Sequence, residues 1–340
     1  IRYRSVSRGL GDVYKRQIED PFFRLNERGL QWIDKEDWVY ETCFTLAADM
    51  MRKENMELVF EGLDTYADVY LNDECILKAD NMFRRWSIPV RQYIREENNI
   101  LKVYFHSPVK IDVPKWDALP YQYPASNDQS ENGGLFNKKI SIFARKAGYH
   151  YGWDWGPRLV TSGIWRPVYI RAWSDLRIND VFIEQKEVGA GRAVIAGHVE
   201  LDADKDMDGV LVTITDEATG RVLGEWQADL KRGTNRVTVD FVLHKPKLWW
   251  SNGLGEPFLY RFRTDIIAGG ELLDSKTERV GIRSLKVVHQ PDKDGHTFYI
   301  ELNGRPVFAK GANYIPSDNF LPRVTPENLS LIHISEPTRH

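Results

Sequence analysis

The chain has 340 residues, 42% of them hydrophobic and 28% charged, which is ordinary for a globular protein; at roughly 150 residues per domain, the length fits two domains with a remainder. Its formal net charge of −3 gives no electrostatic reason to expect nucleic acid or an anionic membrane as a partner. No apolar run approaches the roughly 20 residues that a membrane-spanning helix needs. The two cysteines, Cys43 and Cys75, exclude a disulfide scaffold and leave a single bridge open.

The chain is rich in aromatic residues, with 11 Trp, 15 Tyr and 15 Phe. Flat aromatic side chains serve as large core residues of a β-sandwich or as surfaces on which sugars and bases stack. Composition alone leaves both uses open.

Both ends of the chain differ from the rest. Residues 1–17 are basic and lack periodicity, and residues 329–340 (LSLIHISEPTRH) resemble a translated sequencing adapter, as does the stretch 12–17. An ordinary frayed terminus is the alternative. We interpret both ends as foreign tails on an open-ended piece of a longer protein. A signal peptide ahead of Ile18 would then be lost, so a periplasmic, secreted or lysosome-like compartment stays open.

Residues 18–174 show short alternating strands separated by turn residues. The segments 57–60 and 68–71 are examples, and Asn72-Asp73 is a turn signal. This spacing predicts an all-β sandwich of the jelly-roll type. The stretch 112–156 is long, loop-like and rich in Pro, Asn, Gly, Tyr and Trp. Its aromatic content argues against disorder, so we expect a functional loop.

Alternation resumes over residues 175–284. Its clearest strands are 210–214, 236–243 and 258–266, and the turn at 268–270 (Ala-Gly-Gly) predicts a hairpin. A segment of this size and pattern predicts a smaller, immunoglobulin-like sandwich, although it lacks the cysteine pair of antibody domains.

A third region begins at about residue 285. The segments 297–302 and 306–310 flank Asn303-Gly304, a strong hairpin signal. A further element starts at about residue 311 and soon reaches the C-terminal tail.

The densest group of potential binding residues is Gly152-Trp153-Asp154-Trp155-Gly156. In an extended segment Asp154 would oppose the two indoles, whereas in a tight turn all three side chains could line one pocket. Such a pocket suits a sugar, because a carboxylate accepts strong hydrogen bonds from hydroxyls and an indole covers the C–H face. The alternative is a buried Trp pair with Asp154 bonded to the backbone or to Arg158. The local pattern leaves both open.

Other patterns give no cofactor or metal site. The segment 204–209 matches the first half of a calcium loop, but the twelfth position is Thr215 instead of Glu, which favours an acidic turn. The histidines lack zinc-ligand spacing, and His150 is of interest only for its neighbours. The pair Asn26-Glu27, a type that marks the acid/base in some glycosidases, precedes the first clear strand and is interpreted as surface. No phosphate loop, dinucleotide fingerprint or nucleophile elbow occurs.

The stretch 144–169 (ARKAGYHYGWDWGPRLVTSGIWRPVY) closely resembles the β-mannosidases of glycoside hydrolase family 2. Four further segments resemble that family in the same order along the chain: 32–38, 60–69, 247–260 and 308–323. The run 149–156 is specific to the mannosidase branch, and the others are shared with β-galactosidase and β-glucuronidase relatives. The resemblance covers about residues 18–328.

The resemblance implies a mainly β chain: an N-terminal jelly-roll, galactose-binding-like sandwich over 18–174, an immunoglobulin-like sandwich over 175–284, and the start of a catalytic (β/α)8 barrel over 285–328. It implies exo-acting, retaining hydrolysis of terminal non-reducing β-D-mannose residues, carried out by two glutamates on the barrel. Both glutamates belong to later barrel strands. We therefore expect no catalytic residue in this piece, and no activity from it alone.

The resemblance also implies which residues contact the substrate. A loop of the first domain reaches over the barrel mouth and contacts the non-reducing-end sugar, a role that falls on Trp153, Asp154 and Trp155. Three residues after the first barrel strand are expected to border the same subsite: Asn313, Tyr314 and Asp318. For Asn313, a turn role before a proline is the alternative.

The expected partners are β-mannoside oligosaccharides and, for the longer parent protein, a second copy in a homodimer. We expect no nucleic acid, no membrane, no metal and no cofactor. Two other functions stay open: another exo-glycosidase of the same family, acting on galactosides, glucuronides or glucosaminides, or a non-catalytic carbohydrate-binding module of two sandwiches. The incomplete barrel hairpin argues against the module, because its apolar strand would lie exposed.

Overall fold

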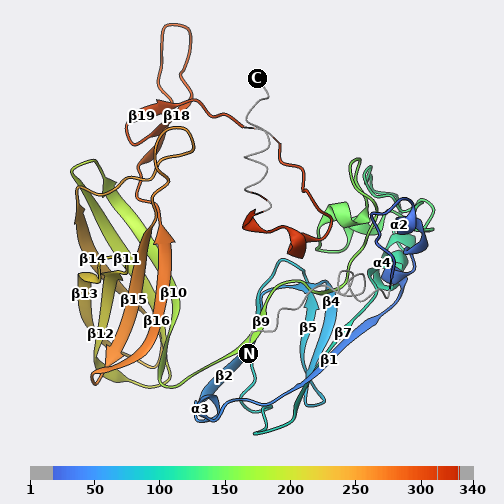
Figure 1. The fold of residues 1–340 in the computed structure, drawn as a ribbon, viewed down its shortest axis with the longest axis horizontal. Helices are drawn as coiled ribbons and strands as arrows, with labels where there is room; N and C mark the ends of the chain where they lie inside the picture. The colour runs from blue at the N-terminus through green and yellow to red at the C-terminus, as the bar shows by residue number, and fades with distance from the viewer. Residues whose placement is uncertain (1–17, 312, 328, 330–340) are drawn as a thin grey trace. The chain divides into compact units, whose positions relative to one another are not determined.

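The computed structural model describes residues 18–311, 313–327 and 329, and these form two compact units (Figure 1). Of the described residues, the first unit contains those up to 172 and those from 314 onward, and the second contains those between 173 and 313. Each unit has its own apolar core. The expected tail 1–17, and all of the expected tail 329–340 except Leu329, lie outside the described residues.

The first unit is a sandwich of antiparallel strands. One sheet has the order β1 (Trp38–Phe44), β7 (Asn99–Phe105), β4 (Tyr66–Leu71), β5 (Glu74–Asp80). The other has the order β6 (Trp86–Pro89), β2 (Asn55–Phe60), β9 (Val168–Trp173). A short pair, β3 (Leu63–Asp64) and β8 (Gly163–Ile164), completes the unit. In β7, Leu101, Val103 and Phe105 alternate with more exposed residues and enter the core, as the period of two requires. The predicted jelly-roll sandwich is confirmed.

Short helices fill the connections of the first unit: α2 (Asn26–Gly29), η1 (Ile33–Lys35), α3 (Ala48–Met51), α4 (Pro108–Asp117), η2 (Ile140–Ile142), η3 (Gly148–Tyr151) and η4 (Leu321–Arg323). Helix α4 corrects the expectation of an irregular loop from residue 112. Its start has two recognisable signals, because Ser107 caps the helix by accepting a bond from the Lys110 amide (3.1 Å) and Pro108 occupies the first turn. Pro114 lies inside the helix, and an internal proline usually argues against a helix in a sequence pattern. None of the described helices is both long and apolar enough to cross a membrane.

The remainder of the long loop is ordered by a small core of its own. Trp116 of α4 packs in one cluster with Ile140, Tyr151 and Val160, all of them buried. This satellite core lies under the segment that carries Asp154, so the segment is supported by side-chain packing instead of by a sheet.

The second unit begins with two packed antiparallel sheets. One contains β10 (Leu176–Val188), β11 (Arg192–Ala203) and β14 (Gly233–His244). The other has the order β13 (Arg221–Leu230), β12 (Met207–Asp216), β15 (Tyr260–Ala268), β16 (Glu271–Val280). In β14, Val237, Val239, Phe241 and Leu243 enter the core at every second position. The predicted immunoglobulin-like sandwich is confirmed.

A three-stranded sheet of β17 (Leu285–Val288), β18 (Tyr299–Leu302) and β19 (Arg305–Val307) follows. Asn303 and Gly304 have φ values of 51° and 76°, which confirms the predicted hairpin turn. The described residues from 308 to 320 form no strand. The expected first barrel strand is therefore not formed in this segment. A parallel barrel strand needs hydrogen bonds to neighbouring barrel strands, and among the described residues no strand pairs with this segment.

We expect Phe262→Ala to lower the free energy of unfolding of the second unit by about 3–5 kcal/mol. Phe262 is fully buried and packs against Phe241 and Tyr260. The matched variant Phe298→Ala, at a side chain 80% exposed, should change it by about 0.5 kcal/mol or less. Urea titration followed by circular dichroism measures both, and equal losses would contradict this assignment of the core.

Candidate functional site

The residues around Asp154 form a tight turn. The Trp153 amide donates to the Gly156 carbonyl (3.2 Å) across it. Gly152 enters the turn with φ of 108°, a conformation that favours glycine, and a Cβ there would lie 2.5 Å from Gln129 Cγ. Of the two arrangements that the sequence left open, the structure has the turn and not the extended strand.

The Asp154 carboxylate is exposed and makes no hydrogen bond or ion pair with any described residue. Trp153 is 37% exposed and Trp155 is half-buried. The alternative, a buried Trp pair with Asp154 bonded to the backbone or to Arg158, is wrong, because Asp154 and Trp153 are exposed and Arg158 pairs with Asp34. A carboxylate without a partner among the described residues is free to accept hydrogen bonds from a polar ligand, and both neighbouring Trp residues are partly exposed.

Arg158 anchors the C-terminal side of the turn. It is 1% exposed, and its Nη2 lies 2.6 Å from Asp34 Oδ2. Its Nη1 donates to Gln31 Oε1 (2.9 Å), while Gln31 Nε2 donates back to the Arg158 carbonyl (2.7 Å). A Cβ at Gly133 would lie 2.5 Å from the guanidinium carbon, so only glycine fits against it. The chain is therefore fixed four residues after Asp154.

Gln129 supports the other side of the turn. Its amide donates to the Tyr151 carbonyl (2.8 Å), and its Nε2 donates to the Trp153 carbonyl (2.7 Å). These two bonds tie the residue before Asp154 to the long loop, so the turn does not depend on its own single hydrogen bond.

Tyr149 links the turn to the segment that follows residue 313. Its ring is tilted against Trp155, with centroids 5.8 Å apart. Burial raises the pKa of the phenol to about 12, and the electrostatic influence of Tyr314 and Asp318 acts in the same direction. Asp318 is itself held by an ion pair with Arg323. Asp318 directly precedes Asn319, whose carbonyl lies 3.0 Å from His150 Nε2, so the structure brings this candidate residue close to the turn.

The candidate Asn313 is the last residue of the second unit. Sequence reasoning missed Asn319. Its Nδ2 donates to the Pro157 carbonyl (2.8 Å), and its side chain packs against Gly156. No local signal marks Asn319, because its partners lie about 160 residues earlier.

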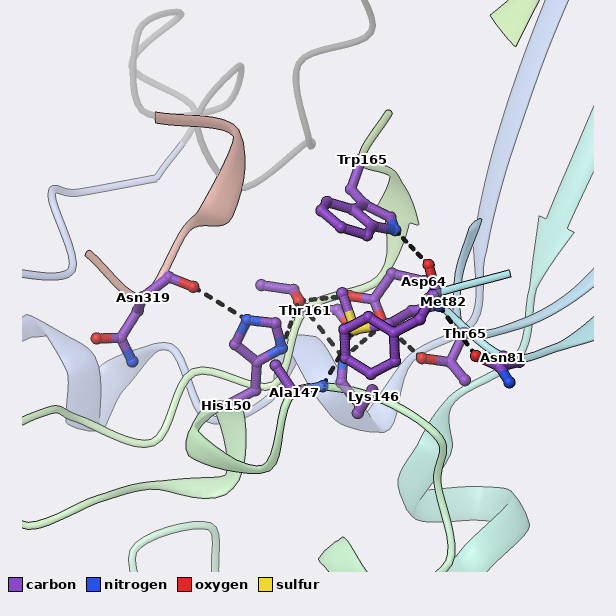
Figure 2. Close-up of polar contacts among 11 residues, drawn as sticks. Asp64, Thr65, Asn81, Met82, Lys146, Ala147, His150, Thr161, Trp165 and Asn319 are labelled. Atoms are coloured by element: carbon purple, nitrogen blue, oxygen red, sulfur yellow. Dashed lines mark hydrogen bonds and ion pairs between the residues drawn. The ribbon is translucent and has the colours of Figure 1, made fainter. Parts of the chain in front are cut away.

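A buried polar network surrounds His150, which precedes the turn by two residues (Figure 2). Lys146 Nζ is 2.7 and 3.0 Å from the two oxygens of Asp64 and 2.7 Å from the Thr161 carbonyl. The Thr161 hydroxyl donates to Asp64 Oδ2 (2.5 Å) and lies 3.3 Å from His150 Nδ1. Neither member of the ion pair has a side chain more than 3% exposed.

The network shifts the pKa values of its members. Burial alone would raise the pKa of Asp64, but the Lys146 charge and the hydrogen bonds lower it overall. Burial lowers the pKa of His150 to about 4, and the Lys146 charge acts in the same direction. His150 is therefore neutral at ordinary pH. In the part of the chain that the structure describes, no group of three or more His, Cys, Asp and Glu side chains is placed to hold a metal ion.

Two family models match the chain, one for each sandwich. Residues 10–166 match the galactose-binding domain-like model of glycosyl hydrolase 2, and residues 176–283 match the model of glycosyl hydrolases family 2. Together they span most of both sandwiches.

Curated relatives include β-mannosidase B of Aspergillus flavus, which is 32% identical over 314 residues. That alignment covers 92% of this chain and 36% of the relative, so the chain spans about a third of the length of such relatives. Among solved structures, the β-D-mannosidase of Dictyoglomus thermophilum is 34% identical with a TM-score of 0.82, and the match covers 95% of this chain and 39% of that one. The exo-chitosanase of Amycolatopsis orientalis matches 94% of this chain and 34% of its own, with a TM-score of 0.68 at 19% identity, which shows a shared fold alone.

We expect His150 to make stability depend on pH between about 6.5 and 4. The histidine pKa is about 4 in the folded chain against an ordinary 6.5, so in this window the unfolded chain binds a proton that the folded chain does not. The free energy of unfolding therefore falls by about 3 kcal/mol as the pH is lowered from about 6.5 to about 4. Urea titrations at several pH values would measure it.

The variant His150→Gln should lack this part of the pH dependence, because it has no titrating ring. The variant His106→Gln, at the half-buried partner of Asp68 in the same sandwich, serves as the control and should retain it. If the free energy of unfolding of His150→Gln varied with pH as in the unsubstituted chain, His150 would not be the source of this pH dependence.

Proposed function

We propose that this chain, which belongs to glycoside hydrolase family 2, forms the N-terminal, substrate-contacting part of an exo-acting β-mannosidase. The parent enzyme would remove terminal non-reducing β-D-mannose residues from β-mannoside oligosaccharides with retention of configuration. One observation carries the proposal: an exposed carboxylate without a partner among the described residues, Asp154, lies in an anchored turn between Trp153 and Trp155 in the sequence. The similarity to β-mannosidases at 32–34% identity supports the choice of sugar.

The turn is suited to binding a sugar. Hydroxyl groups would donate to the Asp154 oxygens, and hydrogen bonds to an ionised acceptor are roughly twice as strong as neutral ones. Trp153 or Trp155 would cover the C–H face of the ring. Because Asp154 has no protein partner to give up, a ligand does not have to break an ion pair before it binds.

The bond-breaking step belongs to other residues. Retaining hydrolysis needs two carboxyl groups about 5–5.5 Å apart, one as nucleophile and one as acid/base. We assign both to the barrel glutamates of the parent enzyme, so Asp154 has a binding role. A carboxylate near the sugar would also stabilise the positive charge that develops in the transition state.

Asp318, Tyr314 and Asn313 are proposed as a second edge of the same subsite. The ion pair with Arg323 fixes the Asp318 carboxylate, and Tyr314 is 56% exposed, so its ring is available for contact. For Asn313 the proposal rests on its position in the sequence next to Tyr314.

We expect Asp154→Ala, made in an enzyme of the relatives' full length that carries this chain, to lower kcat/KM for an aryl β-mannoside about tenfold or more. The physical reason is the loss of a charged hydrogen bond worth about 1–3 kcal/mol in the transition state. Asp117→Ala, at an exposed carboxylate on α4, is the control and should leave the rate unchanged. Near-normal activity of Asp154→Ala would remove the residue from the site. A panel with aryl galactoside, glucuronide and glucosaminide tests the choice of sugar.

We expect the 340-residue chain alone to give no hydrolysis of the same aryl β-mannoside, because the proposed catalytic glutamates lie on the barrel. Purified chain, assayed for release of the aryl group, measures this. Clear turnover by the chain would contradict the assignment of sugar binding to the sandwich and of bond cleavage to the barrel.

A further inference from the structure

Two segments far apart in the sequence meet directly behind the Asp154 turn. His150 Nε2 lies 3.0 Å from the Asn319 carbonyl, across 169 positions of sequence. Asn319 Nδ2 donates to the Pro157 carbonyl (2.8 Å). One bond lies before the turn and the other after it, so Asn319 bridges the two ends of the turn.

The chemistry of the partners decides which atom of His150 carries the proton. A backbone carbonyl can only accept, so Nε2 must be the protonated nitrogen. On the other side of the ring, the short bond from the Thr161 hydroxyl to Asp64 uses the hydroxyl proton. Nδ1 then faces the hydroxyl oxygen without a proton between them. Burial lowers the pKa of His150 to about 4, so the ring is neutral, and the Asn319 carbonyl then places its single proton on Nε2.

The base of this arrangement is rigid. His150 is 2% exposed, and the Asp64–Lys146 pair beneath it is fully buried. Figure 2 shows the imidazole between Thr161 and Asn319, with the ion pair behind Thr161. A hydrogen bond in such a buried place is stronger than in solvent.

The segment carried by this bond includes a proposed subsite residue. Asp318 immediately precedes Asn319, and its Oδ1 accepts a bond from the Phe320 amide (2.8 Å). Fixing the Asn319 carbonyl therefore fixes the backbone from which the Asp318 carboxylate projects. A second attachment exists at the other end, where Phe320 packs edge-on against Phe22 (5.6 Å).

We propose that His150 is a positioning residue of the substrate site: the bond from its Nε2–H to the Asn319 carbonyl holds the segment of Asp318 beside the turn that carries Asp154. As far as the sugar is concerned, this rests on the proposed function. The attachment of the segment itself does not, which lets the two be tested separately.

The first test uses the 340-residue chain and no sugar. Hydrogen exchange followed by mass spectrometry would report on the bonded amides of residues 320, 323 and 324. In His150→Phe, which keeps an aromatic ring but removes the donor, these amides should exchange about tenfold faster. In His150→Gln, whose amide nitrogen can reach the same carbonyl, most of the protection should return. The control His106→Gln should not change it.

A second measurement needs no variant. The ¹⁵N spectrum of the unsubstituted chain should show His150 as the neutral Nε2–H tautomer. The Nδ1–H tautomer would overturn the proposal, whether or not His150→Phe folds. Unchanged exchange at residues 320–324 in His150→Phe would also overturn it.

The third test uses an enzyme of the relatives' full length. His150→Phe should raise KM for an aryl β-mannoside about tenfold with a smaller change in kcat, and His150→Gln should recover most of the loss. Faster exchange with unchanged KM would overturn the positioning role while the proposed function stands. An unsubstituted enzyme that cleaves no β-mannoside would instead refute the proposed function and leave the attachment of the segment to be judged by exchange.

Discussion

The buried ion pair between Lys146 and Asp64 is the interaction on which the candidate site depends. Removing two charges from water costs several kcal/mol per ion, and only close geometry with further hydrogen bonds offsets that cost. Here both carboxylate oxygens lie within 3.0 Å of the ammonium group, and Thr161 supplies its carbonyl and hydroxyl to the same pair. Such a network tolerates few alternative arrangements, since a displaced member would leave a buried charge uncompensated. It therefore defines the position of the chain at residue 146, four residues before His150.

From that fixed point the turn is held by buried groups on either side. His150 and Arg158 each lie four residues from Asp154, and both are at most 2% exposed. The residue that can meet a ligand is exposed, and the residues that position it are buried. This separation has a physical reason: a group that binds a ligand must be accessible, whereas a group that fixes geometry works best where water cannot compete.

The same reasoning explains why a β-sandwich can contribute to a site whose chemistry belongs elsewhere. The two sheets of the first unit supply a stable core, and the long loop adds a satellite core under the turn. Loops on a rigid scaffold are where proteins commonly place binding residues. The turn thus presents Asp154 in a defined position without being part of either sheet. In the proposed enzyme, binding by this domain and bond cleavage by the barrel are separate contributions.

The sequence by itself determined the strands, the hairpin turns and the residue types of the site. The alternation in β14 and the pair Asn303-Gly304 are local features, because the period of a strand and the backbone freedom of a turn are properties of neighbouring residues. Helix α4 was missed although its capping signals are local, since Pro114 concealed them. Whether Asp154 would be exposed in a turn or buried beside Arg158 was decided only by the tertiary structure. The partners that decide it, Gln129, Asp34 and Asn319, lie tens to more than a hundred residues away, and no local pattern records which distant group will satisfy a buried charge or carbonyl.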